Sequence, residues 1–501
     1  MDSPVANGYF YFFVRHEIRR SFNNFSAYRY YGIVRDGITA SRRTKFMKKM
    51  TGSCLVGLVL VSGCTAENDA SDASAPYASR YQARASESTL LQGGTVLTGD
   101  GRRLDGADVL ISDGKIAVVG ADIDADAANV VDAAGMWITP GIIDIHSHHG
   151  VYASPGVAAH SDGNEMSTPV TAEVWAEHAV WPQDPGFVTA LAGGITTLQI
   201  LPGSGNLIGG RSVTLKNVPG RNVQEMKFPN APYGLKMACG ENPKRIYGGM
   251  GQSPMTRMGN VAGYRTAWIE AADYRDKLKA AESGQGEAPM RDLRLETLAG
   301  VLDGEILVHN HCYRADEMSV MLDIAREFGY TIASFQHAVE AYKIADLLAE
   351  SGICAAVWAD WWGFKMESFD GIRENAAIVD RAGACAIIHS DDNYGIQRLT
   401  QEAAKTMGAA AAAGIEIAPE RAIQWVTRNP AKALGILTDT GTLEVGKMAD
   451  VVVWSGSPFS VYSKAERVYI DGWLAYDRND PSANPLTDFS LGTTAVSGGA
   501  Q

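Results

Sequence analysis

Between residues 306 and 414 the chain repeats a short apolar run, then a helical stretch, then a glycine. The apolar runs cover residues 306–309, 330–335, 353–357 and 384–389. Runs this short and without alternation are typical of strands that are buried on both faces. A glycine just after a helix adopts the left-handed conformation that often ends it. The pattern therefore predicts successive βα units and a parallel sheet covered by helices.

Short strands joined by tight turns lie on both sides of this region. Residues 107–111 and 115–119 flank Asp113-Gly114, and residues 467–470 and 473–475 flank Asp471-Gly472. Both patterns are typical of β-hairpins. We expect residues 88–140 and 438–480 to pair into one small β-sandwich, with the βα region of residues 141–437 between them.

The N-terminal region has the pattern of an exported protein. Two lysines at 48–49 precede an apolar run over residues 53–62, and Val61-Ser62-Gly63-Cys64 resembles a bacterial lipobox. The run is shorter than the roughly 20 residues that a membrane-spanning helix needs. We interpret residues 1–64 as an upstream extension followed by a lipoprotein-type signal, in which Cys64 receives a lipid. A membrane-associated helix and an ordinary cleaved signal are the alternatives.

This interpretation predicts a lipid-anchored protein of the bacterial cell envelope that faces the periplasm. Without use of the lipobox, the protein would be secreted. Residues 65–87 are rich in Ala, Ser and Asp, and we expect them to form a disordered tether. Residues 481–501 would be a C-terminal tail.

Composition and charge narrow the function classes. The 501 residues are 46% hydrophobic, which is enough for a large core and more than one domain. The net charge of -13 and the lack of a basic stripe argue against a protein that binds nucleic acid. Four cysteines, at positions 239, 312, 354 and 385, lie in apolar runs without a CxxC pair, and we expect buried free thiols.

Two histidines follow the first predicted strand of the βα region. Residues 142–145 form an apolar run that leads directly into His146-Ser147-His148. Residues two apart on a strand point to the same side, so both imidazoles can bind one metal ion. An isolated HxH motif is a weak signal, and the residues that precede it decide its weight.

The segment WITPGIIDIHSHHG at residues 137–150 closely resembles the first barrel strand of the amidohydrolase superfamily. The segments NPAKALG at 429–435 and GTLEVGKMAD at 441–450 resemble that family's return into its β-sandwich. The resemblance covers roughly residues 88–480 and is nearest to the imidazolonepropionase- and prolidase-like branch. It implies an α/β fold, a (β/α)8 TIM-like barrel with a small β-sandwich formed from both chain ends.

The resemblance also implies a set of metal ligands. Besides His146 and His148, the family uses a histidine that ends strand five. The His-x-x-Arg-Ala-Asp pattern at 311–316 points to His311, with His309 as the alternative. Strand six supplies His337, which would bind a second metal or face the substrate. For each of them the alternative is a hydrogen-bonded core histidine.

After strand eight the family has an aspartate that is both metal ligand and general base, and Asp391 matches it; a simple helix cap is the alternative. Many members bridge two metals with a carboxylated lysine on strand four. Lys236 fits this role, because a lysine charge is costly to bury. Glu241 is the alternative, and without either ligand the site would hold one metal.

These ligands suit a divalent metal, with Zn2+ expected and Mn2+ or Fe2+ as alternatives. Such an ion makes water nucleophilic near neutral pH, and Asp391 would move the proton. Arg245, Tyr247, Tyr313 and Arg314 are candidates for binding the substrate, or structural residues. Trp358, Asp360, Trp361 and Trp362 cluster after strand seven, as a pocket wall or as loop packing.

The resemblance implies a metal-dependent amidohydrolase that cleaves a C–N bond, of a non-peptide or cyclic amide, in a small molecule. A prolidase-like dipeptidase is the alternative enzyme. A lipid-anchored binding module without catalysis is the alternative of another class. The sequence leaves the substrate, the number of metals and a homo-oligomeric assembly open.

Overall fold

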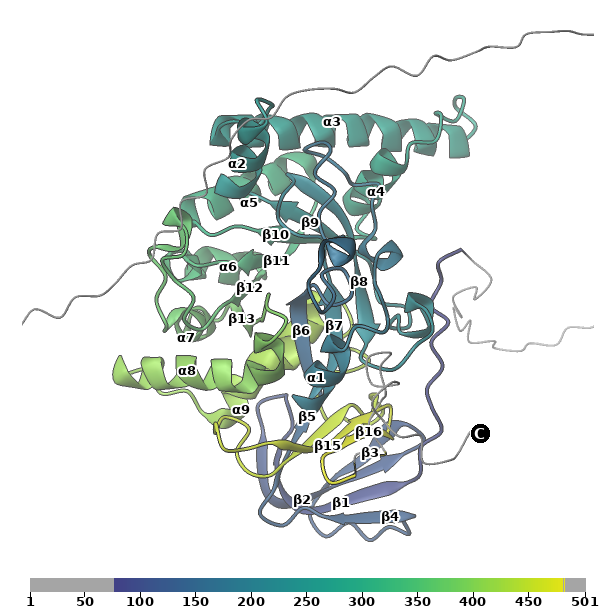
Figure 1. Ribbon diagram of the computed structural model, residues 1–501, viewed down its shortest axis with the longest axis vertical. Helices are drawn as coiled ribbons and strands as arrows, with labels where there is room; N and C mark the ends of the chain where they lie inside the picture. The colour runs from purple at the N-terminus through teal and green to yellow at the C-terminus, as the bar shows by residue number, and fades with distance from the viewer. Residues whose placement is uncertain (1–75, 481, 483–501) are drawn as a thin grey trace, which may run out of the picture. The chain divides into compact units, whose positions relative to one another are not determined.

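The computed structural model describes residues 76–480 and residue 482. The lipoprotein-type signal with Cys64, and residues 483–501 of the predicted tail, lie outside this part. Two eight-stranded sheets organise the described residues (Figure 1). Within them we find no helix that combines the length and the apolar character needed to cross a membrane.

The first sheet forms the barrel, and its strands are neighbours in chain order. They are β6 (Ile142–Ser147), β7 (Ile195–Ile200), β8 (Ile208–Lys216), β9 (Gly234–Ala238), β10 (Leu307–His311), β11 (Ile332–His337), β12 (Cys354–Val357) and β13 (Cys385–Ile388). Almost every position along these strands is buried. The sequence prediction of an α/β barrel is therefore confirmed.

One strand departs from an all-parallel barrel. β8 runs antiparallel to both β7 and β9. The glycine-containing loop of residues 201–207 is all that joins β7 to β8. Two parallel neighbours need a crossover of a dozen or more residues, so a loop this short can only reverse the chain.

Helices surround the barrel strands (Figure 1). They are α1 (Gly186–Ala192), α2 (Glu241–Gly249), α3 (Arg257–Glu282), α4 (Leu293–Leu302), α5 (Ala315–Phe328), α6 (Ala345–Ser351), α7 (Asn375–Arg381), α8 (Leu399–Ala412), α9 (Pro419–Ala422) and α10 (Arg428–Ala433). Gly329 and Gly352 end α5 and α6 with φ of 78° and 67°. These left-handed glycines are the helix stops that the sequence predicted.

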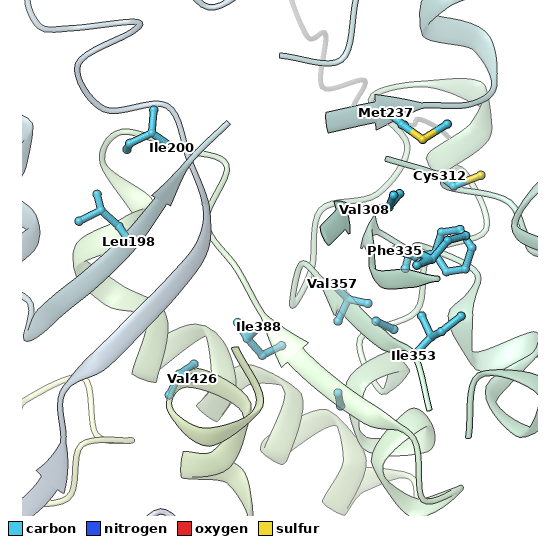
Figure 2. Close-up of a cluster of buried hydrophobic side chains, with 14 of the residues drawn as sticks. Leu198, Ile200, Met237, Val308, Cys312, Phe335, Ile353, Val357, Ile388 and Val426 are labelled. Carbon is cyan, nitrogen blue, oxygen red and sulfur yellow. The ribbon is translucent and has the colours of Figure 1, made fainter. Parts of the chain in front are cut away.

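Apolar and polar positions alternate along the barrel strands. Leu198, Met237, Val308 and Phe335 belong to a buried apolar cluster that also contains residues of the helices (Figure 2). The residues between them are polar and bond to one another: His309 to Ser334 at 2.8 Å, and Gln199 to Ser212 at 2.8 Å. Since neighbours along a strand point to opposite sides, the apolar layer lies toward the helices and the barrel interior is polar.

Asp144 joins the first strand of the barrel to the segment after the last. Its carboxylate accepts hydrogen bonds from the backbone amides of His146 and Ser390, at 3.1 and 3.2 Å, and from the Ser390 hydroxyl. Asp391 N also donates to His146 O at 3.0 Å. Burial raises the pKa of Asp144 to about 7, although these hydrogen bonds oppose the shift. The residues that follow β13 are thereby held next to those that end β6.

Both ends of the described chain form the second sheet. Its strands are β1 (Thr89–Leu97), β2 (Arg103–Ser112), β3 (Lys115–Gly120), β4 (Asn129–Asp132), β5 (Trp137–Pro140), β14 (Val451–Trp454), β15 (Ala465–Ile470) and β16 (Trp473–Asp477). The antiparallel pair β5 and β14 joins the two parts. Both predicted hairpins are present, as β2–β3 and β15–β16.

The described part of the expected tether, residues 76–87, lies against the fold. The Ser79 hydroxyl donates to Lys227 O at 2.6 Å, and the Tyr81 hydroxyl donates to Asp471. The Arg84 guanidinium lies 4.2 Å from the centre of the Trp473 ring. The Ala/Ser/Asp composition of the segment did not predict these contacts. They are made by a few side chains, among them one aromatic and one cationic residue, that the overall composition does not reveal.

All four cysteines in the described part of the chain form disulfides, so the prediction of free thiols is wrong. Cys239 after β9 bonds to Cys312 after β10, and Cys354 of β12 bonds to Cys385 of β13. Each bond joins neighbouring parallel strands, and Cys354 and Cys385 are direct register partners. Their separations of 73 and 31 residues leave no local motif for sequence reasoning to find.

Candidate active site

The histidines at the end of the first barrel strand meet the aspartate after the last. His148 Nε2 lies 3.1 Å and His146 Nε2 lies 3.5 Å from Asp391 Oδ1. One ligand atom from each of the three residues lies within 4.8 Å of the others. The closure of the barrel through Asp144 creates this group, because it places the segment after β13 beside β6.

A second group shares His146. His146, His337 and His389 are all buried, and they also offer ligand atoms within 4.8 Å of one another. His337 ends β11, and its Nε2 lies 3.8 Å from Asp391 Oδ2. Sequence reasoning missed His389, although its place at the end of a barrel strand, two residues before Asp391, was a usable signal. Its two ring nitrogens have no hydrogen-bond partner among the described residues.

The two histidines of β10 lie in different surroundings. His309 Nδ1 is bound to the Ser334 hydroxyl at 2.8 Å. His311 has no partner for either ring nitrogen within the described chain, and its ring centre lies 4.6 Å from that of His337. His311 lies outside the two groups of close ligand atoms but beside them. The structure therefore favours His311 over His309 as the additional ligand.

Lys236 of β9 reaches the same cluster. Its Nζ lies 3.2 Å from His146 Nε2, and its side chain is fully buried. No described carboxylate lies within ion-pair distance of it. Burial lowers its pKa to about 7, which the charge of Asp391 only partly opposes. Lys236 can therefore be neutral at neutral pH.

Buried hydrogen bonds orient the ligands. His146 Nδ1 is bound to Gln336 Oε1 at 3.0 Å, and Gln336 Nε2 donates to Ser334 at 2.7 Å. His148 Nδ1 is bound to Leu201 O at 2.8 Å. In both histidines the second nitrogen, Nε2, faces Asp391. Bonds of this kind fix the ring orientation and tautomer of metal-binding histidines.

Two of these residues have a left-handed backbone conformation. His337 and Asp391 adopt φ of 68° and 49°. Residues other than glycine rarely adopt this left-handed backbone conformation. It costs on the order of 1–3 kcal/mol per residue and persists only where the surrounding structure enforces it. Such strain clusters at functional sites, and here it affects one residue in each of the two groups of ligand atoms.

Burial sets the charge of the cluster. It lowers the pKa of His389 to about 3 and holds the pKa values of His146 and His337 well below their usual range. Burial opposes the ionisation of Asp391, but the hydrogen bond and charge of His148 outweigh it and lower the pKa of that carboxyl. Neutral imidazoles and an ionised carboxylate are the forms that bind metals.

The cluster fits a divalent metal ion. It combines imidazole nitrogens and a carboxylate, which are ligands of Zn2+ and similar ions. Several buried ring nitrogens point into it without a partner among the described residues, and unsatisfied buried groups are costly in a protein interior. The site lies at the carboxyl ends of the barrel strands, where barrel enzymes place their active sites.

Comparison with known proteins agrees with this geometry. The model of the amidohydrolase family matches residues 294–489. The crystal structure of an amidohydrolase from Thermotoga maritima MSB8 has a TM-score of 0.73 and 37% identity, over 78% of this chain and 100% of that one. The chain belongs to the amidohydrolase family.

Two curated relatives are less similar to this amidohydrolase than the Thermotoga protein is, and one of them is much longer than this chain. Amidohydrolase tasK of Hapsidospora irregularis is 32% identical over 398 residues, which are 74% of this chain but 40% of tasK. The chain thus spans less than half of that protein. An imidazolonepropionase of Mesorhizobium japonicum is 25% identical over 385 residues, 72% of this chain and 88% of that one.

Some of the predicted site residues of the amidohydrolase lie apart from this cluster of candidate metal-binding side chains, called the metal cluster below. Tyr247 is buried, and its hydroxyl donates to Thr168 O at 2.6 Å. Arg314 pairs with Asp316 at 2.9 Å on the first turn of α5. Glu241 begins α2 and belongs to neither group of close ligand atoms. Arg314 thus takes part in a surface ion pair, and Lys236 rather than Glu241 reaches the cluster.

Other predicted residues do border it. The Tyr313 ring lies 4.6 Å from that of His311 and 5.7 Å from that of His337. Trp358 stacks on His337 with ring centres 4.2 Å apart, and its Nε1 donates to Ser390 O at 3.1 Å. The aromatic cluster after strand seven therefore forms a wall of the site. Sequence reasoning did not single out Lys365, which donates to the Tyr313 hydroxyl at 3.0 Å.

Proposed function

We propose that this amidohydrolase cleaves a C–N bond in a small non-peptide or cyclic amide at a divalent metal, with zinc as the expected ion. One observation carries the proposal: His146, His148 and Asp391 offer ligand atoms within 4.8 Å of one another. His337 and Lys236 extend this set, and His311 lies next to it. A core of structural histidines would also have partners for the ring nitrogens of His311 and His389, which have none among the described residues.

His146, His148, His337 and Asp391 would hold the ion or ions, with His311 completing the set. A divalent metal bound there would make water nucleophilic near neutral pH and polarise the substrate carbonyl. Asp391 is the proton carrier of the site. Its carboxylate accepts a proton from the attacking water and delivers it to the departing nitrogen. The products are a carboxylic acid and an amine.

We further propose that Lys236 is carboxylated and supplies a bridging carboxylate. Its neutral amine would react with carbon dioxide, form a carbamate and release one proton. This converts a buried amine without a carboxylate partner into an anion beside neutral imidazoles. Glu241 is the weaker candidate, because its carboxylate is absent from both ligand groups.

Metal analysis and activity test the proposal together. We expect the purified protein to contain a divalent metal, to lose amide hydrolysis on chelation and to regain it with Zn2+ or Mn2+. The screen should include N-acyl amino acids, cyclic amides such as hydantoins, and Xaa-Pro dipeptides, because the last separate a prolidase-like dipeptidase from the favoured activity. A protein that binds no metal and hydrolyses none of them would instead be a binding module.

We propose that the protein is anchored to the bacterial cell envelope through lipidated Cys64 and faces the periplasm. The disulfides Cys239–Cys312 and Cys354–Cys385 support an oxidising compartment, because cytosolic thiols are usually kept reduced. We expect Cys64→Ala to move the protein from the membrane fraction to the soluble fraction. Unchanged membrane attachment of this variant would rule out lipidation at Cys64.

A further inference from the structure

A cation without a carboxylate partner lies beside the metal cluster. Lys365, on the loop between β12 and α7, is half-buried. Its Nζ donates to Asn242 Oδ1 and to the Tyr313 hydroxyl, both at 3.0 Å. No described carboxylate lies within ion-pair distance of it. Its two partners are neutral, so the ammonium keeps its charge available for an anion.

The surroundings place this charge close to the reacting groups. Lys365 interacts electrostatically with Asp391, and it contributes to lowering the pKa of His311. Arg245, a substrate-binding candidate from the sequence, is a second cation near Lys365. Glu241 and Glu367 face the same region, and Glu367 is paired with Arg257. The ammonium therefore lies at the hydroxyl of Tyr313, whose ring centre is 4.6 Å from that of His311.

An aromatic wall extends from the metal cluster along the same loop. Trp358, which stacks on His337, also stacks on Trp361 with ring centres 5.1 Å apart. Phe364 packs edge-on against Trp358 at 5.6 Å and against Tyr313 at 6.3 Å. Trp361 and Phe364 are 40% and 50% exposed, so the wall is uncovered at its outer end.

A narrow pocket of about 20 Å³ follows this wall inward to His337. It has room for a water-sized group only, so a larger apolar group would lie at the exposed outer end of the wall, on Trp361 and Phe364. The pocket is lined by His337, Trp358, Asp360, Trp361, Trp362 and Arg373. Exposed aromatic side chains at the mouth of a polar pocket are typical of sites that bind an apolar group of a ligand. The adjacent ammonium adds a site for an anion, which a lysine binds as a point charge.

We propose that the substrate is an amide that also carries a free carboxylate and a large apolar group. Lys365, whose Nζ lies 5.4 Å from the centre of the Phe364 ring, binds the carboxylate with the Tyr313 hydroxyl, and Trp361 and Phe364 contact the apolar group. N-Acyl derivatives of apolar amino acids have this chemistry. The inference rests on the proposed hydrolysis for its reaction, in which water adds to the acyl carbon and the amino acid leaves with the proton.

Binding to an inactive variant tests the inference without turnover. We would use calorimetry on Asp391→Asn with N-acetyl-L-phenylalanine, and with N-acetylphenethylamine, which is the same molecule without its carboxylate. The carboxylated probe should bind more tightly, and Lys365→Met should weaken it about 10- to 100-fold while leaving the other probe unchanged. Lys365→Arg should retain part of the effect because it keeps the charge.

Two controls sharpen the result. Lys277→Met removes an exposed lysine of α3 and should change neither affinity. N-Acetylglycine and N-acetyl-L-leucine report on the apolar wall, and Trp361→Ala should weaken the phenylalanine probe more than the glycine probe. The inference is overturned if no carboxylated probe binds better than its decarboxylated partner, or if Lys365→Met weakens both equally. Lys365-dependent binding in a wild-type protein without hydrolytic activity would instead overturn only the proposed function.

Discussion

Two buried lysines of the barrel sheet show how the partners of a side chain decide its role. Lys216 ends β8, beside Thr197 near the start of β7, and Lys236 lies in β9. Both are fully buried. Lys216 Nζ lies 2.7 Å from Asp471 and 3.2 Å from Asp450, whereas Lys236 Nζ has His146 Nε2 at 3.2 Å.

The difference distinguishes two ends of the barrel. Lys216 lies at the structural end, which contacts the second sheet, and Lys236 lies at the chemical end, which carries the candidate active site. Asp450 and Asp471 flank β14 and β15 of the second sheet, so Lys216 fastens that sheet to the barrel. Lys236 has no compensating carboxylate, and burial lowers its pKa to about 7. A buried charge with partners contributes to structure, whereas a buried amine without them is available for chemistry.

The largest effect should come from a substitution in the candidate active site, and it should be on the rate of hydrolysis. Asp391→Asn removes the proposed proton carrier, so we expect kcat to fall about 10²- to 10⁴-fold, the usual contribution of a general base. Circular dichroism and the thermal midpoint should remain close to those of the wild type. Hydrolysis at the wild-type rate would exclude Asp391 as the base.

At the structural end, Lys216→Met should reduce stability. The substitution leaves Asp450 and Asp471 buried without their cation, which costs about 3–5 kcal/mol in the free energy of unfolding. Chemical denaturation measures this value. Lys277→Met, at an exposed pair with Asp273, is the matched control and should cost less than about 1 kcal/mol. Equal losses in the two variants would show that Lys216 is not a structural fastener.

The loss in Lys216→Met should also depend on pH. Burial first, and then the charge of Asp450, raises the pKa of Asp471 above 3.8, and Lys216 opposes this shift. A carboxyl with a raised folded pKa destabilises the fold as pH rises through that pKa, and the cost disappears below the unfolded value. Removing Lys216 enlarges the shift, so the variant should lose more stability at about pH 8 than at about pH 5. A loss that is constant across this range would contradict the assignment.

The smallest change in stability is expected at Lys236. Because this lysine has no ion pair to lose, Lys236→Met should alter the free energy of unfolding by less than about 1.5 kcal/mol, as volume-conserving core changes do. Metal content and hydrolysis should nevertheless fall in this variant. A destabilisation as large as that of Lys216→Met would show that the two lysines play the same role.

Local motifs predicted much of the barrel and of its site. His146 and His148 are close because they end one strand, and Gly329 and Gly352 end helices as their left-handed conformation allows. These features depend on a few neighbouring residues, so a single sequence reveals them. The antiparallel course of β8 was also encoded locally, by the short loop before it.

Contacts between residues that are far apart in the chain could not be predicted from such local motifs. The disulfides, the fastening of Lys216 and the position of Lys365 each join residues that are distant in the chain, and no spacing rule connects them. His389 was overlooked because its role depends on which side of the barrel its ring faces. Arg314 lies beside His311 in sequence, and only the structure shows that it pairs with Asp316.

The sequence by itself determined the family, the βα units of residues 306–414 and the two terminal hairpins. It also indicated His146, His148 and Asp391 at strand ends, because each of these features depends on residues close together in the chain. Only the tertiary structure decided which of those side chains share one site, which cysteines bond and which buried lysine has carboxylate partners. Closure of the barrel brings distant strands together, and burial then sets charge and partners according to what each side chain meets there.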